Sequence, residues 1–340
     1  MHIFVTGGAG FIGSTFLRLL SDQVPSAIVT NFDALTYAGN LDNIKGLEPQ
    51  QHEFVRGDIS DRAAVLAALR PGCDAIINFA AESHVDRGIA SADQFLRTNI
   101  IGTQVLLDAA RERDAKRFVQ VSTDEVMGSL PEDDSAYFTE DSPFAPNSPY
   151  AASKAAAEHL VRAGHYTFGL DTVITRCGNN YGPRQFPEKF LPLALSKALD
   201  DEPIPVYGDG RNVRDWIYVE DHCRAILLAM QKGRPGALYN IGARNSRRNI
   251  DLVESLLELL GKPQSLIRFV KDRPGHDRRY AINPGLIESE LGWRPRESWA
   301  SGLQKTIDWY QRNTAWLERA RSGAYQDYYR AQYGAEVAAN

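Results

Sequence analysis

A tyrosine and a lysine one helical turn apart carry the first chemical signal. Tyr150 and Lys154 form a YxxxK pattern, and Ser148-Pro149 before it is a helix start with a serine cap and a first-turn proline. On a helix the two side chains share one face. An ammonium beside a phenol favours the phenolate and lowers the pKa of the phenol. Tyr150 could therefore take a proton from a sugar hydroxyl while the carbon that bears this hydroxyl gives up a hydride. The alternative is an exposed Tyr and Lys on an alanine-rich helix.

Adjacent carboxyl groups form the second signal. Thr123, Asp124 and Glu125 follow a predicted strand at 116–122, and open α/β sheets bind ligands beyond the carboxyl ends of their strands. Thr123 could hydrogen-bond the reacting oxygen. Crowding and burial raise the pKa of one carboxyl and leave the other ionised, which gives one general acid and one general base. From the residues alone, a solvated acidic turn remains an equal alternative.

A glycine-rich turn forms the third signal. Gly7, Gly10 and Gly13 are spaced GxxGxxG between a predicted strand and a predicted helix. The spacing predicts a sharp turn at Gly7, close approach of a pyrophosphate at Gly10 and helix packing at Gly13. Asp33 lies 20 residues past Gly13, where a carboxylate can accept hydrogen bonds from a ribose and repel a 2′-phosphate. This favours NAD over NADP, and the alternative is a structural turn with a chance aspartate.

The elements that must position these groups alternate between strand and helix. Strands are predicted at 2–6, 29–32, 53–56, 74–80 and 116–122, and helices at 12–21, 61–69 and 98–113. This alternation predicts an α/β fold with a parallel, doubly wound sheet. The second half is less regular, with helices predicted at 191–199, 251–260 and 303–313 and short strands at 204–207 and 238–241.

Composition narrows the class of protein. Lys and Arg number 38 against 43 Asp and Glu, a net charge of −5, which argues against a nucleic-acid partner. No run of 18 apolar residues predicts a membrane span, and the N-terminal segment does not resemble a signal peptide. The cysteines Cys73, Cys177 and Cys223 form no pair with metal or disulfide spacing. We therefore expect a cytoplasmic protein with no bound metal.

Taken together, the motifs resemble the extended short-chain dehydrogenase/reductase family, and within it the nucleotide-sugar 4,6-dehydratases. The resemblance runs from about residue 2 to 313 and favours the acid–base interpretation of Asp124 and Glu125. It is carried by GGAGFIG (7–13), DALTYAGNL (33–41), AAESHVDR (80–87), STDEV (122–126), SPYAASKA (148–155), NNYGPRQFPEK (179–189), VRDWIYVEDH (213–222) and DRPGHDRRYAIN (272–283). The sequence departs from the family pattern at Met127, where the family usually has Tyr, and at Gly178 and Ala243.

The resemblance implies a lyase reaction that begins with oxidation. Tyr150, with Thr123 and Lys154, would remove the proton of the sugar C4 hydroxyl while hydride passes from C4 to NAD. Glu125 would take the C5 proton and Asp124 would protonate the departing C6 hydroxyl. Hydride returns to C6, so NAD is regenerated in each cycle and stays tightly bound. The implied substrate is dTDP-glucose, and the implied products are dTDP-4-keto-6-deoxyglucose, for deoxysugar biosynthesis, and water.

The resemblance also implies two sets of binding residues. It assigns NAD contacts to Gly7, Gly10, Phe11, Ile12, Gly13, Asp33, Ala34, Leu35, Thr36, Asp58, Ile59, Phe79, Ala80, Ala81, Thr98, Tyr150, Lys154 and Asn180. It assigns nucleotide-sugar contacts to Ser83, Thr123, Asn179, Glu188, Lys189, Pro205, Tyr207, Arg214, Asn249 and His276. Lys189 and Arg214 are suited to a pyrophosphate, and Pro205 and Tyr207 could pack against the base.

The same resemblance implies a domain arrangement and an assembly. We expect an NAD-binding Rossmann domain at 1–178, with a returning segment near 215–242. A smaller mixed α/β domain, mainly 179–214 and 243–335, would bind the nucleotide sugar. The helices at 98–113 and 150–168 are expected to pair across a two-fold axis into a homodimer.

Other functions remain as alternatives at this stage. The same reaction on UDP-glucose is one, and an NAD-dependent C4 epimerase is another, although an epimerase has no water to eliminate and no use for both carboxyls. A catalytically inactive nucleotide-binding subunit would be expected to have lost Tyr150, Lys154 or the carboxyl pair, all of which are present.

Overall fold

The computed structural model describes residues 1–83, 92–133 and 136–321. The end of the AAESHVDR motif (84–87) and the end of the expected substrate domain (322–335) lie outside these ranges.

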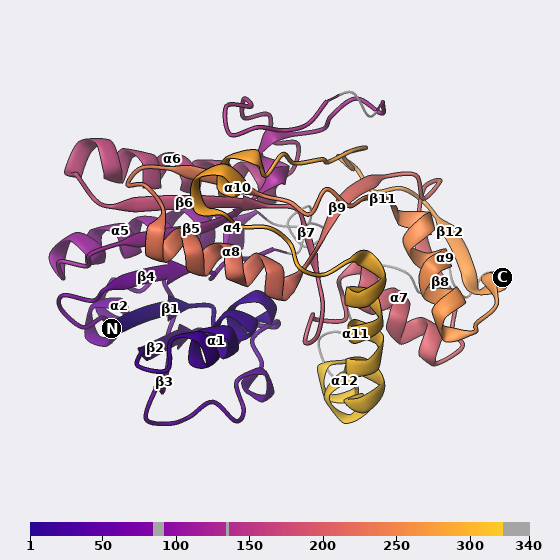
Figure 1. Ribbon diagram of the computed structural model, residues 1–340, viewed down its shortest axis with the longest axis horizontal. Coiled ribbons are helices and arrows are strands. Elements are labelled where there is room, and N and C mark those ends of the chain that lie inside the picture. The colour runs from indigo at the N-terminus through magenta and orange to yellow at the C-terminus, as the bar shows by residue number, and fades with distance from the viewer. Residues whose placement is uncertain (84–91, 134–135, 322–340) are drawn as a thin grey trace.

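A parallel sheet organises the larger part of the molecule (Figure 1). Its strand order is β10-β6-β5-β4-β1-β2-β3, and each neighbouring pair is parallel. The strands are β1 (His2–Thr6), β2 (Ile28–Asp33), β3 (His52–Arg56), β4 (Ala75–Asn78), β5 (Phe118–Thr123), β6 (Thr172–Cys177) and β10 (Leu238–Ile241). The order reverses direction between β1 and β4, so this is the predicted doubly wound sheet, of Rossmann type.

Helices cover both faces of this sheet. α1 (Phe11–Gln23) and α8 (Val219–Lys232) contact each other on one face, over a buried cluster that includes Phe16 and Ile226. The other face carries α2 (Arg62–Ala68), α5 (Thr103–Glu112) and α6 (Pro149–Phe168). A three-residue α4 (Asp93–Phe95) and a π-helical segment, η2 (Leu96–Gly102), lead into α5. The predicted helix 98–113 is therefore the later part of a longer helical stretch.

Residues from the second half of the chain complete the large sheet. β10 pairs with β6 in parallel register, with Tyr239 opposite Thr175, and α8 packs on α1. β6 and α8 escaped the sequence analysis because their apolar residues are interrupted by polar ones, such as Arg176 in β6 and Asp221 in α8. The expected domain limits remain a prediction, but this return places part of 215–242 in the large sheet.

A smaller part carries the rest of the chain and has its own core. β7 (Asn179–Tyr181), β9 (Val213–Tyr218) and β11 (Ser246–Arg248) form one sheet, and β8 (Ile204–Tyr207) pairs with β12 (Ile267–Val270). Its apolar cluster gathers residues from α7 (Phe190–Leu199), α9 (Asn249–Leu260), α11 (Trp299–Arg312) and α12 (Thr314–Arg321). α10 (Gly285–Leu291) packs instead against β10 and α8. Short 3-10 turns occupy η1 (Leu41–Asn43), η3 (Asp124–Met127) and η4 (Gln264–Leu266).

A buried aspartate joins the two parts. Asp221, in the first turn of α8, is 1% exposed. Its carboxylate accepts backbone hydrogen bonds from Arg296 and Glu297 at 2.8 and 2.9 Å, and its carbonyl accepts the indole N–H of Trp293. Because a charged acceptor at a helix N-terminus is favoured, Asp221 fixes the segment that leads into α11 against the larger part.

Within the described residues, no helix is long and apolar enough to cross a membrane. In the same part of the chain, no cluster of three or more His, Cys, Asp or Glu side chains has the geometry of a metal site.

Candidate active site

The tyrosine–lysine pair lies at the start of α6, as its sequence predicts. The Ser148 hydroxyl accepts the backbone N–H of Ala151 at 3.1 Å, and Pro149 occupies the first turn. Lys154 is 5% exposed, and its Nζ donates to the carbonyl of Val121, in β5, at 2.7 Å. The ammonium is therefore held against the carboxyl end of the sheet.

The expected effect of Lys154 on the tyrosine is wrong for this structure. The pKa of Tyr150 is raised well above its ordinary value, first by burial and then by the charges of Glu125, Cys177 and Asp124. A hydrogen bond with Thr123 is the contribution that lowers the pKa of Tyr150. Burial of the phenol and the nearby carboxyl groups, which the tyrosine–lysine spacing does not reveal, outweigh the ammonium. Tyr150 is therefore a protonated phenol here, and a positive charge brought beside it would favour its ionisation.

Asp124 is the more deeply buried of the two carboxyl groups. η3 begins directly after β5, and Asp124 is 2% exposed. Its Oδ1 accepts a hydrogen bond from the Thr123 hydroxyl at 3.3 Å, and its buried Oδ2 has no hydrogen-bond partner. Burial, followed by the charges of Glu125 and Asp215, raises the pKa of Asp124 well above its ordinary value. A carboxyl in this setting keeps its proton to higher pH than an exposed one and can donate it.

Glu125 is partly buried and faces cations. Burial raises its pKa, and the charges of Arg273, Arg214 and Lys189 oppose that rise. The environment therefore separates the two carboxyls in the predicted direction, although the pKa of each is raised. The Lys189 ammonium donates to the carbonyl of Ser83 at 2.7 Å, so two of the predicted substrate residues lie together.

The glycine turn has no room for side chains at Gly7 and Gly13, where the sequence predicts a sharp turn and helix packing. Gly7 has φ +70°, and a Cβ there would lie 2.6 Å from the amide nitrogen of Ala80. A Cβ on Gly13 would lie 2.2 Å from the carbonyl oxygen of Gly7, whereas one on Gly10 would meet only that same oxygen, at 3.3 Å. Gly13 is therefore a packing position, and Gly10, at the N-terminus of α1, leaves space for a ligand.

Asp33 lies beside this turn. The carboxylate accepts backbone hydrogen bonds from Ala9 at 2.9 Å and from Leu35 at 2.8 Å. Burial raises the pKa of Asp33, and both backbone bonds lower it. Leu35 has φ +52°, so the chain turns sharply after β2. Ala34 and Thr36 belong to this turn, at the carboxyl end of β2. An open helix N-terminus, a buried carboxylate and a backbone without side chains fit a dinucleotide such as NAD.

The other predicted cofactor positions lie near the carboxyl ends of the same strands or beside them. Phe11 and Ile12 begin α1, Phe79 to Ala81 follow β4, and Asp58 and Ile59 follow β3. Thr98 lies in the π-helical segment. The Asn180 amide is engaged internally, with its Oδ1 on His222 and its Nδ2 donating to the carbonyl of Gly178 at 3.1 Å. For Asn180, therefore, no side-chain contact to a cofactor follows from the geometry.

Predicted substrate residues gather on the smaller part. The Arg214 guanidinium is 5% exposed, lies 4.3 Å from the ring centroid of Tyr280 and donates to the carbonyl of Asp277 at 2.9 Å. Tyr207 and His276 face each other edge to face, with centroids 5.9 Å apart. Burial, then Arg273 and Arg214, lower the pKa of His276 to about 4, so this ring is neutral.

The remaining substrate candidates differ in their surroundings. Asn249 begins α9, and its buried Oδ1 has no hydrogen-bond partner. Glu188 is buried beside Lys189, and Pro205 lies in β8 opposite Arg268 of β12. Asn179 begins β7, opposite Trp216 of β9. An orphaned amide oxygen is the clearest local sign of a missing ligand group, and Asn249 is the member of this set that shows it.

Sequence reasoning missed residues that hold the site together. The amide of Asn99, in η2, donates to the Ser153 hydroxyl at 2.8 Å and exchanges two hydrogen bonds with the backbone of Glu82. The Glu158 carboxylate, one turn after Lys154, accepts hydrogen bonds from both the Nε and the Nη2 of Arg176. Glu158 could have been found from the sequence, because it lies four residues after Lys154 and so on the same face of the predicted helix.

Met127 lies in a buried apolar cluster behind η3, together with Val126, Phe138 and Tyr280. The departure from the family tyrosine is thus accommodated by apolar packing.

The folded arrangement defines a class of protein. The model of the GDP-mannose 4,6 dehydratase family matches residues 4–306, and the chain belongs to that family. A relative named dTDP-glucose 4,6-dehydratase, from Xanthomonas campestris pv. campestris strain B100, is 50% identical over 343 residues, covering 95% of this chain and 96% of the relative.

Solved structures agree with this assignment. The crystal structure of the dTDP-glucose 4,6-dehydratase DesIV from Streptomyces venezuelae, which holds NAD, is 50% identical, with a TM-score of 0.90 over 94% of this chain and 100% of that one. The UDP-glucose 4-epimerase of Thermus thermophilus, also with NAD, is 30% identical, with a TM-score of 0.84 over 92% and 99% of the two chains. The dehydratase is thus the more similar of these two in sequence.

Two glycine substitutions separate packing from ligand approach. Gly13→Ala should lower both the free energy of unfolding and the NAD retained after purification, because its Cβ meets the Gly7 backbone. Gly10→Ala should leave the free energy of unfolding within about 1 kcal/mol of the parent and still lower the retained NAD at least tenfold. Denaturant titration and chromatography of the extracted nicotinamide measure the two quantities. Full NAD content in Gly10→Ala would contradict the expected approach of the pyrophosphate.

Proposed function

We propose that this protein is an NAD-dependent hydro-lyase that converts dTDP-glucose to dTDP-4-keto-6-deoxyglucose and water. The observation that carries the proposal is the Asp124–Glu125 pair beyond β5, where one carboxyl is buried with an unpartnered oxygen and the other faces three cations. An elimination of water needs both an acid and a base on the same sugar. An epimerase eliminates no water and has no use for the pair.

Tyr150, ionised when positive charge lies beside it, takes the proton of the sugar C4 hydroxyl as the hydride leaves C4, and Thr123 hydrogen-bonds the same oxygen. The phenol lies at the start of α6, and its hydrogen bond with Thr123 places a second hydroxyl beside it. When bound, NAD supplies the chemistry of accepting a hydride from C4 and returning it to C6. The Lys154 ammonium adds positive charge at this end of the sheet, and the oxidised C4 leaves an acidic hydrogen on C5.

Glu125 and Asp124 then divide the elimination between them. Glu125 removes the C5 proton as a carboxylate, and the cations Arg273, Arg214 and Lys189 favour that ionised form. Asp124 delivers its proton to the C6 hydroxyl, which departs as water. The proton taken from the C4 hydroxyl replaces, through solvent, the one that Asp124 gives to the departing water, and C5 is reprotonated from Glu125 or solvent.

The cations of the smaller part hold the nucleotide. Lys189 and Arg214 face the carboxyl pair, and both types of side chain bind diphosphate oxygens. The residues assigned by resemblance to NAD and to the nucleotide sugar are proposed contacts on this basis. The segments 179–214 and 243–321 are proposed as the described portion of the sugar-binding domain.

Solvent deuterium tests the proposed reaction. In deuterated water, dTDP-glucose should yield a product that has lost one water and retains one deuterium at C5. Asp124→Asn should lower product formation by about 10²-fold or more while the recovered dTDP-glucose still acquires deuterium at C5. Glu125→Gln should block that exchange as well. Mass spectra of both sugars give the result.

The same assay discriminates the alternatives. Conversion of UDP-glucose in preference to dTDP-glucose would transfer the proposal to the other nucleotide. An inverted C4 centre without loss of water would overturn it in favour of an epimerase.

The pKa of Lys154 predicts an alkaline limit to turnover. Burial lowers the pKa of Lys154 to about 8, and the charge of Glu158 is the largest contribution that raises it. Turnover should therefore fall as the pH rises through about 8, where the ammonium loses its proton. Removing the Glu158 charge should move this fall to lower pH.

Paired variants make that pH profile interpretable. Glu158→Gln alone leaves Arg176 buried and unpaired, which costs about 3–5 kcal/mol of stability. The double variant Glu158→Gln, Arg176→Met removes both charges and should show the same displacement of the profile. Glu112→Gln, at an exposed ion pair with Arg62, is the control and should leave the profile in place. An unchanged profile in the double variant would refute the role of Glu158.

We also propose a homodimer through the helical stretches that include 98–113 and 150–168. Large apolar side chains there are exposed: Ile101 by 53%, Tyr166 by 67% and Phe168 by 51%. They lie on η2 and α6, which contact each other, and exposed apolar side chains of this size mark protein contacts. The same surface of a second copy would cover them. The free, buried cysteines support the further proposal of a cytoplasmic location.

A charged substitution tests this surface. Ile101→Glu should shift the sedimenting mass at micromolar concentration from that of a dimer to that of a monomer, because it would bury an unpaired charge in the interface. Leu259→Glu, on a similarly exposed apolar residue of α9, should leave the mass unchanged. A monomeric parent protein would refute the proposal.

A further inference from the structure

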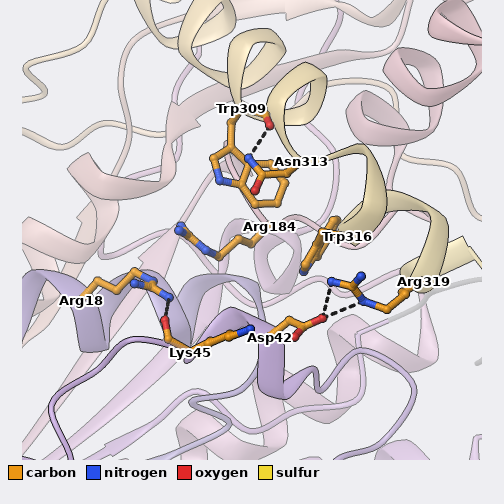
Figure 2. Close-up of a pocket in the computed structure, with 8 residues that line it drawn as sticks. All are labelled: Arg18, Asp42, Lys45, Arg184, Trp309, Asn313, Trp316 and Arg319. Atoms are coloured by element: carbon orange, nitrogen blue, oxygen red, sulfur yellow. Dashed lines mark hydrogen bonds and ion pairs between the residues drawn. The ribbon is translucent and has the colours of Figure 1, made fainter.

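A cavity of about 320 Å³ lies between the larger part and the C-terminal helices. It is lined by Arg18, Asp42, Lys45, Arg184, Trp309, Asn313, Trp316 and Arg319. None of these residues belongs to the predicted catalytic, cofactor or substrate set. Figure 2 shows Arg184 in the middle of the group, with Arg18 and Lys45 to one side and Trp309 above it.

The lining carries an excess of positive charge. Four of the lining side chains are cationic and one, Asp42, is a carboxylate. Asp42 pairs with Arg319, with an N–O distance of 2.7 Å. Across residues 1–83, 92–133 and 136–321, no carboxylate forms an ion pair with Arg18, Lys45 or Arg184. Three positive charges therefore face a small space without a paired counter-charge.

The cations are held in place by the fold. The Arg18 guanidinium donates from Nε and Nη2 to the carbonyl of Asn43 at 3.2 and 2.8 Å and from Nη2 to the carbonyl of Lys45 at 2.8 Å. The Arg184 guanidinium lies 5.4 Å from the Trp309 ring centroid, and its backbone has φ +68°. Burial and the charge of Arg18 lower the pKa of Arg184 to about 10. The two guanidiniums repel each other, and an anion between them would relieve that repulsion.

The aromatic walls are equally fixed. Trp309 and Trp316 meet edge to face with centroids 5.0 Å apart. The Trp316 indole N–H donates to Oδ1 of Asn43 at 2.9 Å. A site that is already organised loses little conformational entropy when a ligand binds.

We propose that this cavity is a binding site for a small anion that carries two or more linked phosphates. Planar guanidiniums bind phosphate oxygens in pairs, and cations on several sides of the space match an extended multiple charge better than a single one. The cavity size and the chain's net charge of −5 fit a small ligand rather than a nucleic acid.

The site is connected to the glycine turn through a buried amide. Asn43 is 1% exposed, and its Nδ2 donates to the carbonyl of Ala9 at 2.9 Å. The backbone N–H of Ala9 in turn bonds Asp33. An anion that bridges Arg18 and Lys45 to Arg184 would tie the C-terminal helices to the segment behind that turn, and it should raise the unfolding temperature.

Calorimetry with inorganic tripolyphosphate tests the site on the NAD-loaded protein. Saturating dTDP is present, so that the nucleotide-sugar site is filled. The parent protein should bind the probe with a 1:1 stoichiometry and with an affinity that falls as salt rises. Lys45→Met, at an exposed position, and Arg184→Met should each weaken binding at least tenfold. Lys232→Met, an exposed lysine at the end of α8, is the matched control and should bind as the parent does.

Several outcomes decide the proposal. No binding by the parent, or equal binding by Lys45→Met and the parent, would overturn it, and the second result would place the anion elsewhere. A parallel titration with dTTP distinguishes the source: equal affinity indicates recognition of the phosphates alone, and tighter binding indicates that the base contacts the tryptophans. Dehydratase activity is recorded separately, so failure here leaves the proposed reaction untouched.

Discussion

The buried ion pair between Glu158 and Arg176 is the constraint on which the catalytic end of the sheet depends. Both side chains are almost fully buried, at 1% and 2% exposed. Glu158 also accepts the Ser122 hydroxyl at 2.6 Å. One carboxylate therefore joins α6 to β5 and β6. Burying such a pair costs desolvation energy, which satisfied hydrogen bonds offset in part.

Electrostatic balance around the carboxyls follows from that anchoring. A deep position raises the pKa of a carboxyl, and it does so for both Asp124 and Glu125. The two carboxyls differ in the cations that act on them. Arg273 and Lys189, from segments remote in sequence, lower the pKa of Glu125. The large part supplies the acids and the small part supplies most of the charge that differentiates them. The reaction at this site thus requires both parts of the chain, correctly placed against each other.

The sequence was sufficient for features with a local cause. The glycine turn, the Ser148 cap and the alternation of strands and helices each depend on neighbouring residues, and the parallel sheet follows from them. Features with a distant cause could not be predicted. The pKa of Tyr150 is raised by burial and by carboxyl groups that approach it through folding. β6 pairs with β10, although its polar residues obscure the strand pattern in the sequence. The buried ion pair at Glu158 and the cation cavity are likewise products of tertiary contact.

The return of β10 to the large sheet has a consequence for how the chain folds. β6 ends at Cys177, and its outer partner begins at Leu238. Until residue 241 has been synthesised, the backbone edge of β6 and the apolar surface that α8 will cover stand exposed. Unpaired strand edges and uncovered apolar surface promote misassembly during folding. The intervening residues, 178–237, include the first strands of the small part, so the small part begins to form before the large sheet is complete.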